Sequence, residues 1–167
     1  LIRLADQDRT LWDSGLITEG QALVRACLRR NSPGPFQIQA AIAAVHADAR
    51  RAEDTDWSQI MDLYDHLLAI HPSPVVALNR AVAMGELNGV AAALEALEAL
   101  EALGALDVDG FTRYQPYHAA RADLLARAGR ADDARDAYNR AIELSENPIE
   151  RDFLEQGRAG LQSQELD

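Results

Sequence analysis

Signals that start and stop helices recur along the whole chain, and they leave no room for a run of strands. Proline, glycine and asparagine interrupt the sequence at residues 31–35, 71–74 and 86–89, and an acidic turn with glycine follows at 107–110. Between these breaks the apolar residues recur every three or four positions, which is the spacing of a helix face. The pattern predicts an all-α fold of about eight helices joined by short turns.

Capping residues mark where these helices begin and end. Thr10 begins one capping box and Asp56 another, each followed three residues later by an acid or amide. Asn147 is an N-cap with proline at the first helical position, and Gly129 ends the helix before the last pair. The expected helices cover residues 11–30, 35–49, 57–70, 74–85, 90–106, 112–128, 131–144 and 148–161.

In each expected helix, the apolar residues form a stripe along one side, which we expect to be buried. Aromatic residues make up only 5% of the chain, and alanine and leucine supply most of its apolar content, which suits helices packed through small side chains. The leucines of 90–106 recur every third residue, so this run predicts a packed helix rather than a coiled coil. The stripes of the second, third and fourth helices are Ile38, Ile42, Val45 and Ala49; Trp57, Ile60, Tyr64 and Leu67; and Val75, Leu78 and Val82.

One pattern occurs twice: a small or apolar residue, three residues, tyrosine, two residues, an apolar residue, and a later proline. It occurs in "IMDLYDHLLAIHP" (60–72) and in "GRADDARDAYNRAIELSENP" (129–148), and it resembles the second helix of a tetratricopeptide (TPR) repeat. The resemblance implies antiparallel helical hairpins stacked as a short right-handed solenoid, with a concave groove lined by the first helix of each pair. We expect one domain over 1–167, with a helical cap at 1–32, about three helix pairs at 35–146 and a capping helix at 147–163.

Five separated blocks, in order along the chain, resemble the C-terminal extension of a group of extracytoplasmic-function (ECF) RNA polymerase sigma factors. The blocks are "LADQDRTLWD", "GPFQIQAAIAAVHADARRAEDTDW", "LYDHLLAIHPSPVVALNRAVAM", "YHAARADLLARAGRADDARDAYNRAIEL" and "NPIERDFL". Such proteins carry two domains that bind DNA and polymerase, then a TPR-containing tail, and the match covers the tail alone. The resemblance implies a protein–protein interaction module that regulates transcription initiation through its own sigma domains, RNA polymerase or another protein.

The charge of the chain argues against two classes of partner. The formal net charge is −11, and the sequence offers no basic cluster beyond "RACLRR" at 25–30. Direct binding to nucleic acid or to an anionic membrane is therefore not expected of this segment. No apolar run approaches the ~20 residues that span a bilayer, and we expect a cytoplasmic protein. An acidic surface can instead attract basic sigma domains in place of DNA, and such an attraction would weaken as salt rises.

The N-terminal part of the chain holds the first candidate partner-binding residues. Asp8, Arg9 and Trp12 precede a helix, where they form either a docking surface for the sigma domains or a capped, ion-paired start of that helix. Asp56 is explained by capping, with a partner contact as the alternative. His46 flanks the stripe of the second helix.

Further candidates lie on the expected first helices of later repeats. Asn79 and Arg80 interrupt an apolar helix, where they face a groove that holds a partner peptide, or where Asn79 bridges a neighbouring helix. Tyr114, His118 and Arg121 fall on one helix face by their spacing. This face either binds a carboxylate or a backbone carbonyl, or links neighbouring helices.

Motifs for catalysis and for metal or cofactor binding are absent from the sequence. There is no GxGxxG, GxxxxGK[ST], HExxH or GxSxG pattern, and no two histidines have the spacing of a zinc site. Cys27 stands alone and is expected to be a small core residue. We therefore expect no enzymatic activity, no catalytic residue, no metal and no cofactor.

Two other functions remain open at this point. The alanine–leucine helix 90–103 and the terminal helices could present apolar faces for a homodimer, which would make the chain a self-associating structural module. A groove closed into a deep pocket with converging polar groups would instead favour a sensor of a small ligand.

Overall fold

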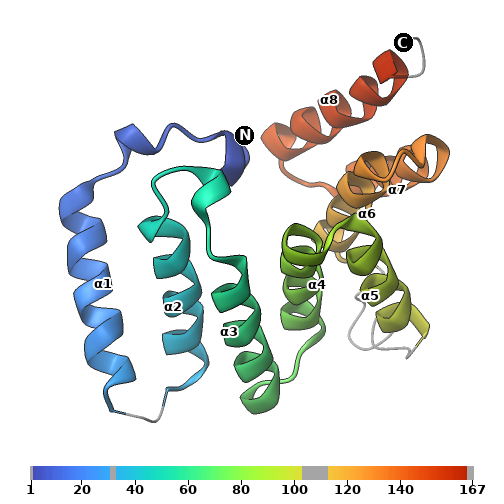
Figure 1. The fold of residues 1–167 in the computed structure, drawn as a ribbon. Helices are drawn as coiled ribbons and strands as arrows, with labels where there is room; N and C mark the ends of the chain where they lie inside the picture. The colour runs from blue at the N-terminus through green and yellow to red at the C-terminus, as the bar shows by residue number, and fades with distance from the viewer. Residues whose placement is uncertain (1, 31–32, 103–112, 165–167) are drawn as a thin grey trace. The chain divides into compact units, whose positions relative to one another are not determined.

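The computed structural model describes residues 2–30, 33–102 and 113–164, with side chains as far as Leu161. Helices account for the regular structure of these residues, and no strand occurs among them, so the predicted all-α class is confirmed (Figure 1). Three 3₁₀ turns lie at Leu4–Asp6, Arg9–Leu11 and Ala52–Asp54. The α-helices are α1 Ser14–Leu28, α2 Pro35–Asp48, α3 Trp57–Ile70, α4 Pro74–Asn88, α5 Val90–Ala102, α6 Gln115–Arg127, α7 Ala131–Leu144 and α8 Pro148–Gln164.

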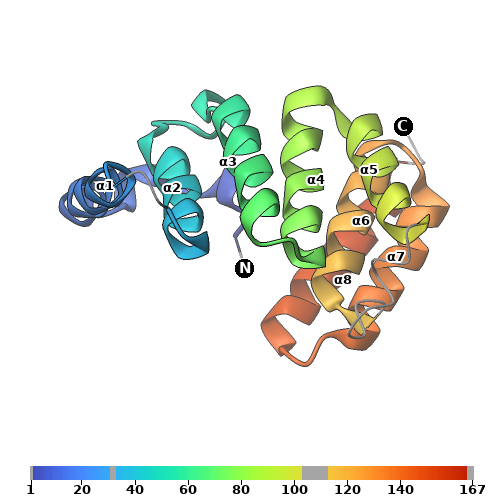
Figure 2. The same cartoon turned by 90° about the horizontal axis from the view of Figure 1, so that it is seen from below.

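The chain divides into two compact units, Ile2–Arg80 and the residues from Ala81 onward. In the first unit α1 packs on α2 and α2 packs on α3 (Figure 2). In the second unit α5 packs on α6, α6 on α7 and α7 on α8. The expected single domain stays a prediction.

The first unit builds its core from branched aliphatic side chains of α2 and α3. The predicted α2 stripe is confirmed, since Ile38, Ile42, Val45 and Ala49 are all buried. On α3 the buried side chains include Ile60 and Leu67, each at most 1% exposed, whereas Trp57 and Tyr64 of the predicted stripe are half-buried. Val75 of the expected α4 stripe is 38% exposed, and its neighbour Val76 is buried instead.

The second unit packs helices closely through small side chains. Ala134, Ala137 and Ala141 put a fully buried alanine face on α7, beside the buried ring of Tyr138. Gly157 of α8 lies against that ring, because a Cβ at this glycine would stand 2.9 Å from the Tyr138 hydroxyl. Helix α8 can approach α7 at this point only with glycine there.

Most of the expected helix boundaries agree with the structure. Asp56 caps α3, because its Oδ1 accepts a hydrogen bond of 3.0 Å from the Gln59 backbone N–H. Asn147 Oδ1 accepts from the Ile149 N–H at 2.9 Å at the start of α8. Gly129 adopts φ of +73° after α6, a left-handed conformation in which glycine carries no Cβ penalty. The loop expected at 107–110, the end of the helix expected at 90–106 and the start of the helix expected at 112–128 lie outside the described residues.

The predicted N-cap Thr10 is wrong. Residues Arg9–Leu11 form a 3₁₀ turn, and the Asp8 carboxylate accepts hydrogen bonds from the Thr10 N–H and hydroxyl. The N-cap of α1 is Asp13, whose Oδ1 accepts from the N–H groups of Gly15 at 2.8 Å and Leu16 at 3.0 Å. Helix α1 therefore begins at Ser14, after the separate 3₁₀ turn Arg9–Leu11.

Replacing Gly157 by alanine should destabilise the packing of α8 on α7. The added Cβ would press on the buried Tyr138 ring, and overpacking of this kind costs about 1–3 kcal/mol. Gly160→Ala is the matched control in the same helix, because a Cβ at Gly160 meets nothing within 4 Å, and it should be neutral or stabilising. Urea denaturation followed by circular dichroism measures both, and equal stabilities of the two variants would contradict the close contact.

Candidate functional site

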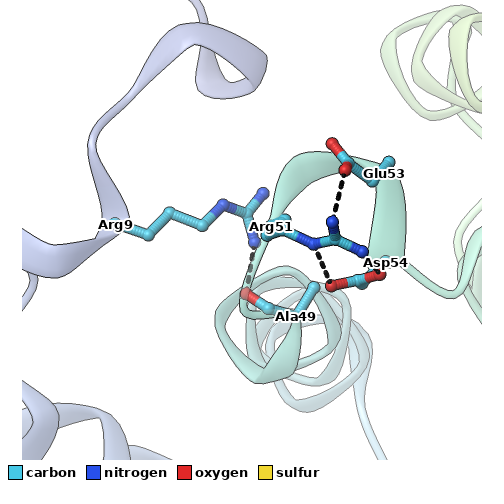
Figure 3. Close-up of polar contacts among 5 residues, drawn as sticks. All are labelled: Arg9, Ala49, Arg51, Glu53 and Asp54. Carbon is cyan, nitrogen blue, oxygen red and sulfur yellow. Dashed lines mark hydrogen bonds and ion pairs between the residues drawn. The ribbon is translucent and has the colours of Figure 1, made fainter.

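Arg9 joins the N-terminal segment to the carboxyl end of α2. Its Nη1 donates hydrogen bonds to the backbone oxygen of Ala49 at 2.7 Å (Figure 3) and to that of His46 at 2.8 Å. The last carbonyls of a helix lack partners within the helix, and they carry the negative end of its dipole. The Arg9 guanidinium also lies 4.9 Å from the centre of the Trp12 ring. Two predicted partner-binding residues, Arg9 and Trp12, thus contact each other, and Arg9 caps the end of α2.

His46 belongs to the same cluster. Its ring meets Trp57 of α3 edge-on, with 5.2 Å between the ring centroids and 78° between the planes. Burial lowers the pKa of His46 below its ordinary value, and the nearby positive charge of Arg9 lowers it further. His46 Nδ1 and Arg9 Nε are both buried without a hydrogen-bond partner in the described part of the chain. Burial and the Arg9 cation therefore both favour the neutral imidazole.

The acidic candidates near this cluster serve the backbone. Asp8 is exposed, and the Thr10 hydroxyl that donates to it holds its pKa below the usual range. Asp56 caps α3, as described above. Beside it, Asp54 and Glu53 both pair with Arg51 at 3.0 Å (Figure 3). Local turn chemistry thus accounts for the positions of Asp8 and Asp56.

A hollow of about 310 Å³ lies in the first unit, between α2, α3 and the first turns of α4. Polar side chains reach it from three helices, namely Gln39 of α2, Tyr64 of α3 and Asn79 of α4. Its lining holds no Asp, Glu, Lys or Arg, although 26% of the chain is charged. The whole lining is Gln39, Ile42, Tyr64, Leu67, His71, Ser73, Val75, Val76 and Asn79.

The neighbours Asn79 and Arg80 face different surroundings. Asn79 is exposed and lines the hollow. Arg80 does not line it, because its guanidinium pairs with the Asp65 carboxylate of α3. The polar pair within this apolar helix therefore divides into one residue that is open to a ligand and one that links α4 to α3.

In the second unit, Tyr114, His118 and Arg121 were predicted to share one helix face, and this prediction is wrong for Tyr114. Tyr114 lies outside α6 as its N-cap, with an extended backbone at φ −82° and ψ 102°. His118 meets the Tyr117 ring edge-on at 5.1 Å between centroids, and Arg121 Nε lies 3.8 Å from Glu101 of α5. The helix begins only after Tyr114 because Pro116 occupies its first turn.

Sequence reasoning missed Tyr117 and Glu101, which form the polar contact between α5 and α6. The Tyr117 hydroxyl donates a hydrogen bond to the Glu101 carboxylate. Burial and then this carboxylate raise the pKa of Tyr117 far above its ordinary value. Its position seven residues before the buried Leu124 is the signal that marked it as part of the core face.

The side chains and helices of the described residues bear on two other kinds of site. No group of three or more His, Cys, Asp or Glu side chains there is arranged to hold a metal ion. Within the same residues, no helix has the length and apolar character needed to cross a membrane. Cys27, expected in the core, is half-buried on α1.

Comparison with known proteins gives one informative match. The chain is 46% identical over 154 residues to an uncharacterized protein of Rhizobium meliloti (strain 1021). The match covers 92% of this chain and 35% of the relative, so the chain spans about a third of the length of that protein. No family model matches the chain. No solved structure matches it either.

Replacing Arg9 by methionine should destabilise the first unit by about 2 kcal/mol, because hydrogen bonds from a charged donor contribute about 1.5–3 kcal/mol. Methionine keeps an unbranched apolar stem but leaves the His46 and Ala49 carbonyls without this donor. Arg3→Met is the control, since Arg3 pairs with Asp6 on the surface, and it should cost under about 1 kcal/mol. Chemical denaturation measures both, and equal losses would show that Arg9 contributes no more than a surface ion pair.

The stability of the first unit should fall as the pH drops below about 6.5, the ordinary pKa of histidine. The pKa of His46 is lowered in the fold, so between that value and 6.5 the unfolded chain binds more protons, and unfolding becomes easier. His46→Gln should remove this slope, whereas His66→Gln on the exposed side of α3 should retain it. Unfolding free energies measured from pH 8 to about 5 test this, and an unchanged slope in His46→Gln would contradict the lowered pKa.

Proposed function

We propose that this segment is a TPR-like module of a longer protein, which binds a peptide segment of a protein partner in the hollow beside Asn79. The observation that carries the proposal is the uncharged polar lining of that hollow within an acidic, highly charged chain. On the TPR interpretation, α2 and α4 are the first helices of two successive hairpins. The hollow then lies on the concave side, where a stacked array receives its ligand.

The chemistry of the lining suits the main chain of a peptide. A peptide presents neutral N–H and C=O groups in alternation, and each must find a partner when it leaves water. The Asn79 and Gln39 amides each supply donors and an acceptor, and the Tyr64 and Ser73 hydroxyls supply both kinds. The apolar floor of Ile42, Leu67 and Val76 leaves room for a small apolar side chain.

The regulatory role is proposed from the family resemblance. The five sequence blocks resemble the tail of ECF sigma factors, and the matched region forms about a third of the Rhizobium meliloti relative. We propose that the module contacts the sigma domains of its parent protein, or RNA polymerase, and so controls transcription initiation without enzymatic activity. The net charge of −11 would add a long-range attraction to basic sigma domains, in competition with DNA.

These two contributions differ in their response to salt. Screening weakens an attraction between exposed charges, whereas hydrogen bonds and apolar contacts in an uncharged hollow are affected little. Binding to sigma domains should therefore weaken with salt and level off at a residual affinity that the hollow supplies. Disappearance of all binding at moderate salt would assign the contact to surface charge alone.

Asn79→Ala should weaken binding to the separately prepared sigma domains of the parent protein by about tenfold, the equivalent of ~1.4 kcal/mol. The loss should persist at both low and moderate salt, because the Asn79 amide is uncharged. Asn88→Ala is the matched control, since Asn88 is an exposed asparagine at the end of the same helix and outside the hollow. Titration calorimetry measures both variants, and equal affinities of Asn79→Ala and the unchanged chain would contradict the proposed site.

A further inference from the structure

A second hollow, of about 370 Å³, lies in the second unit between α7 and α8. The two helices are in tight contact where Gly157 meets the Tyr138 ring. The residues that follow these two in the chain are joined as well, because Arg158 Nη1 donates a hydrogen bond of 2.6 Å to the Asn139 Oδ1. The lining of the hollow is Arg135 and Asn139 of α7 with Glu155, Arg158 and Ala159 of α8.

The charge of Arg158 is not neutralised by a neighbouring acid. Among the described residues, no Asp or Glu carboxylate forms an ion pair with its guanidinium, although Glu155 stands one turn earlier on α8 and lines the same hollow. By contrast, Arg51, Arg80 and Arg127 each pair with an acid, as expected of a chain with 27 acidic and 16 basic residues. The half-buried Arg158 therefore keeps a positive charge that a ligand can meet.

The polar groups of this hollow are mainly hydrogen-bond donors. A guanidinium has five N–H groups and accepts no hydrogen bond, and two guanidinium groups line the hollow. The Asn139 oxygen already accepts from Arg158, so the amide offers its NH₂ group, for which no acceptor occurs in the described part of the chain. A ligand that satisfies these donors must be rich in acceptors and negatively charged.

We propose that this hollow binds the carboxylate of an acidic side chain from a protein partner. A carboxylate is planar and has two oxygens, which matches the fork of N–H groups on a guanidinium. Arg158 and Asn139 supply donors side by side, and their mutual hydrogen bond fixes their relative positions. Arg135, which also pairs with Asp132 at 2.7 Å, adds positive charge from one turn earlier on α7.

The charge balance of the hollow favours a carboxylate over a phosphate group. The lining carries two positive side chains and one negative side chain, and Asp132 adds a further negative charge beside Arg135. A carboxylate brings a single negative charge into this balance. A phosphate dianion would bring two, and both Glu155 and Asp132 would repel it.

The exposure of the hollow favours a protein partner over a free small molecule. Glu155 and Ala159 are exposed, so a small carboxylate would keep much of its surface in water and bind weakly, whereas a protein adds contacts around the site. The net charge of −11 repels acidic proteins at long range. The site therefore suits one acidic residue within a neutral or basic partner surface, and it does not depend on the hollow beside Asn79.

Two probes of the same shape test which group is recognised. The α-amide of N-acetylaspartate presents a side-chain carboxylate, and the α-amide of N-acetylasparagine replaces it with a neutral amide. The first should shift the NMR signals of the Asn139 side-chain amide and the Arg158 Nε–H with a dissociation constant on the order of millimolar, and the second should not. Equal shifts from both probes, or equally strong binding of inorganic phosphate at the same ionic strength, would overturn the proposal.

Three variants test the residues of the site with the aspartate probe. Arg158→Gln should weaken binding about tenfold, because it removes a charged donor. Arg140→Gln is the matched control, since Arg140 pairs with Glu143 on α7 outside the hollow, and it should bind as the unchanged chain does. Glu155→Gln should bind about threefold more tightly, because it removes a repulsive charge from an exposed position.

The gain in Glu155→Gln separates binding from a structural role, because a link that only joined α7 to α8 would not raise affinity for a carboxylate. Circular dichroism of each variant checks that the helices are retained. Undiminished binding by Arg158→Gln, or no gain in affinity with Glu155→Gln, would overturn the proposal.

Discussion

With only 5% aromatic residues, the helices of this chain pack through small side chains or through branched aliphatic ones. In the second unit this constraint is met by the alanine face of α7 and by Gly157 of α8. In the first unit, branched side chains such as Ile38 and Ile60 form the buried core of α2 and α3 instead. Between α2, α3 and α4 a hollow remains, and its polar lining is what makes it a candidate site.

The polar residues of the N-terminal segment take part in this architecture. Arg9 donates hydrogen bonds to backbone carbonyls at the end of α2. Asp8 and Asp13 accept hydrogen bonds from backbone N–H groups, Asp8 in the 3₁₀ turn before α1 and Asp13 in the first turn of α1. The "LADQDRTLWD" block therefore has structural roles that account for its composition before any partner is considered. Helix α1 follows directly, and none of its fifteen residues is buried.

Local signals in the sequence predicted the helices, but they could not predict contacts between residues far apart in the chain. Asp56, Asn147 and Gly129 act on residues next to them, so their roles could be inferred from spacing alone. The wrong N-cap prediction at Thr10 also has a local cause. Asp8 caps the 3₁₀ turn and Asp13 caps α1, and the spacing of these residues alone does not show that two separate elements begin there. Proline in the first turn similarly leaves Tyr114 outside α6.

The candidate site was predicted less completely than the helices. Arg9 bonds to residues 37 and 40 positions away, and no spacing rule links positions that far apart. Asn79 was expected at a groove, but the hollow also needs Gln39 and Tyr64, which come from two other helices. The exposure of Leu16 and Leu23 on α1 depends on which side α2 occupies, and only the packed structure decides that.

The central claim is that an uncharged hollow beside Asn79 receives a partner peptide. Amide hydrogen exchange of the segment, with and without the sigma domains of its parent protein at moderate salt, tests this most directly. The account predicts added protection at the α2 and α4 residues that border the hollow, around 39–42 and 75–79. Protection confined to other parts of the chain, with no change in these two stretches, would contradict it.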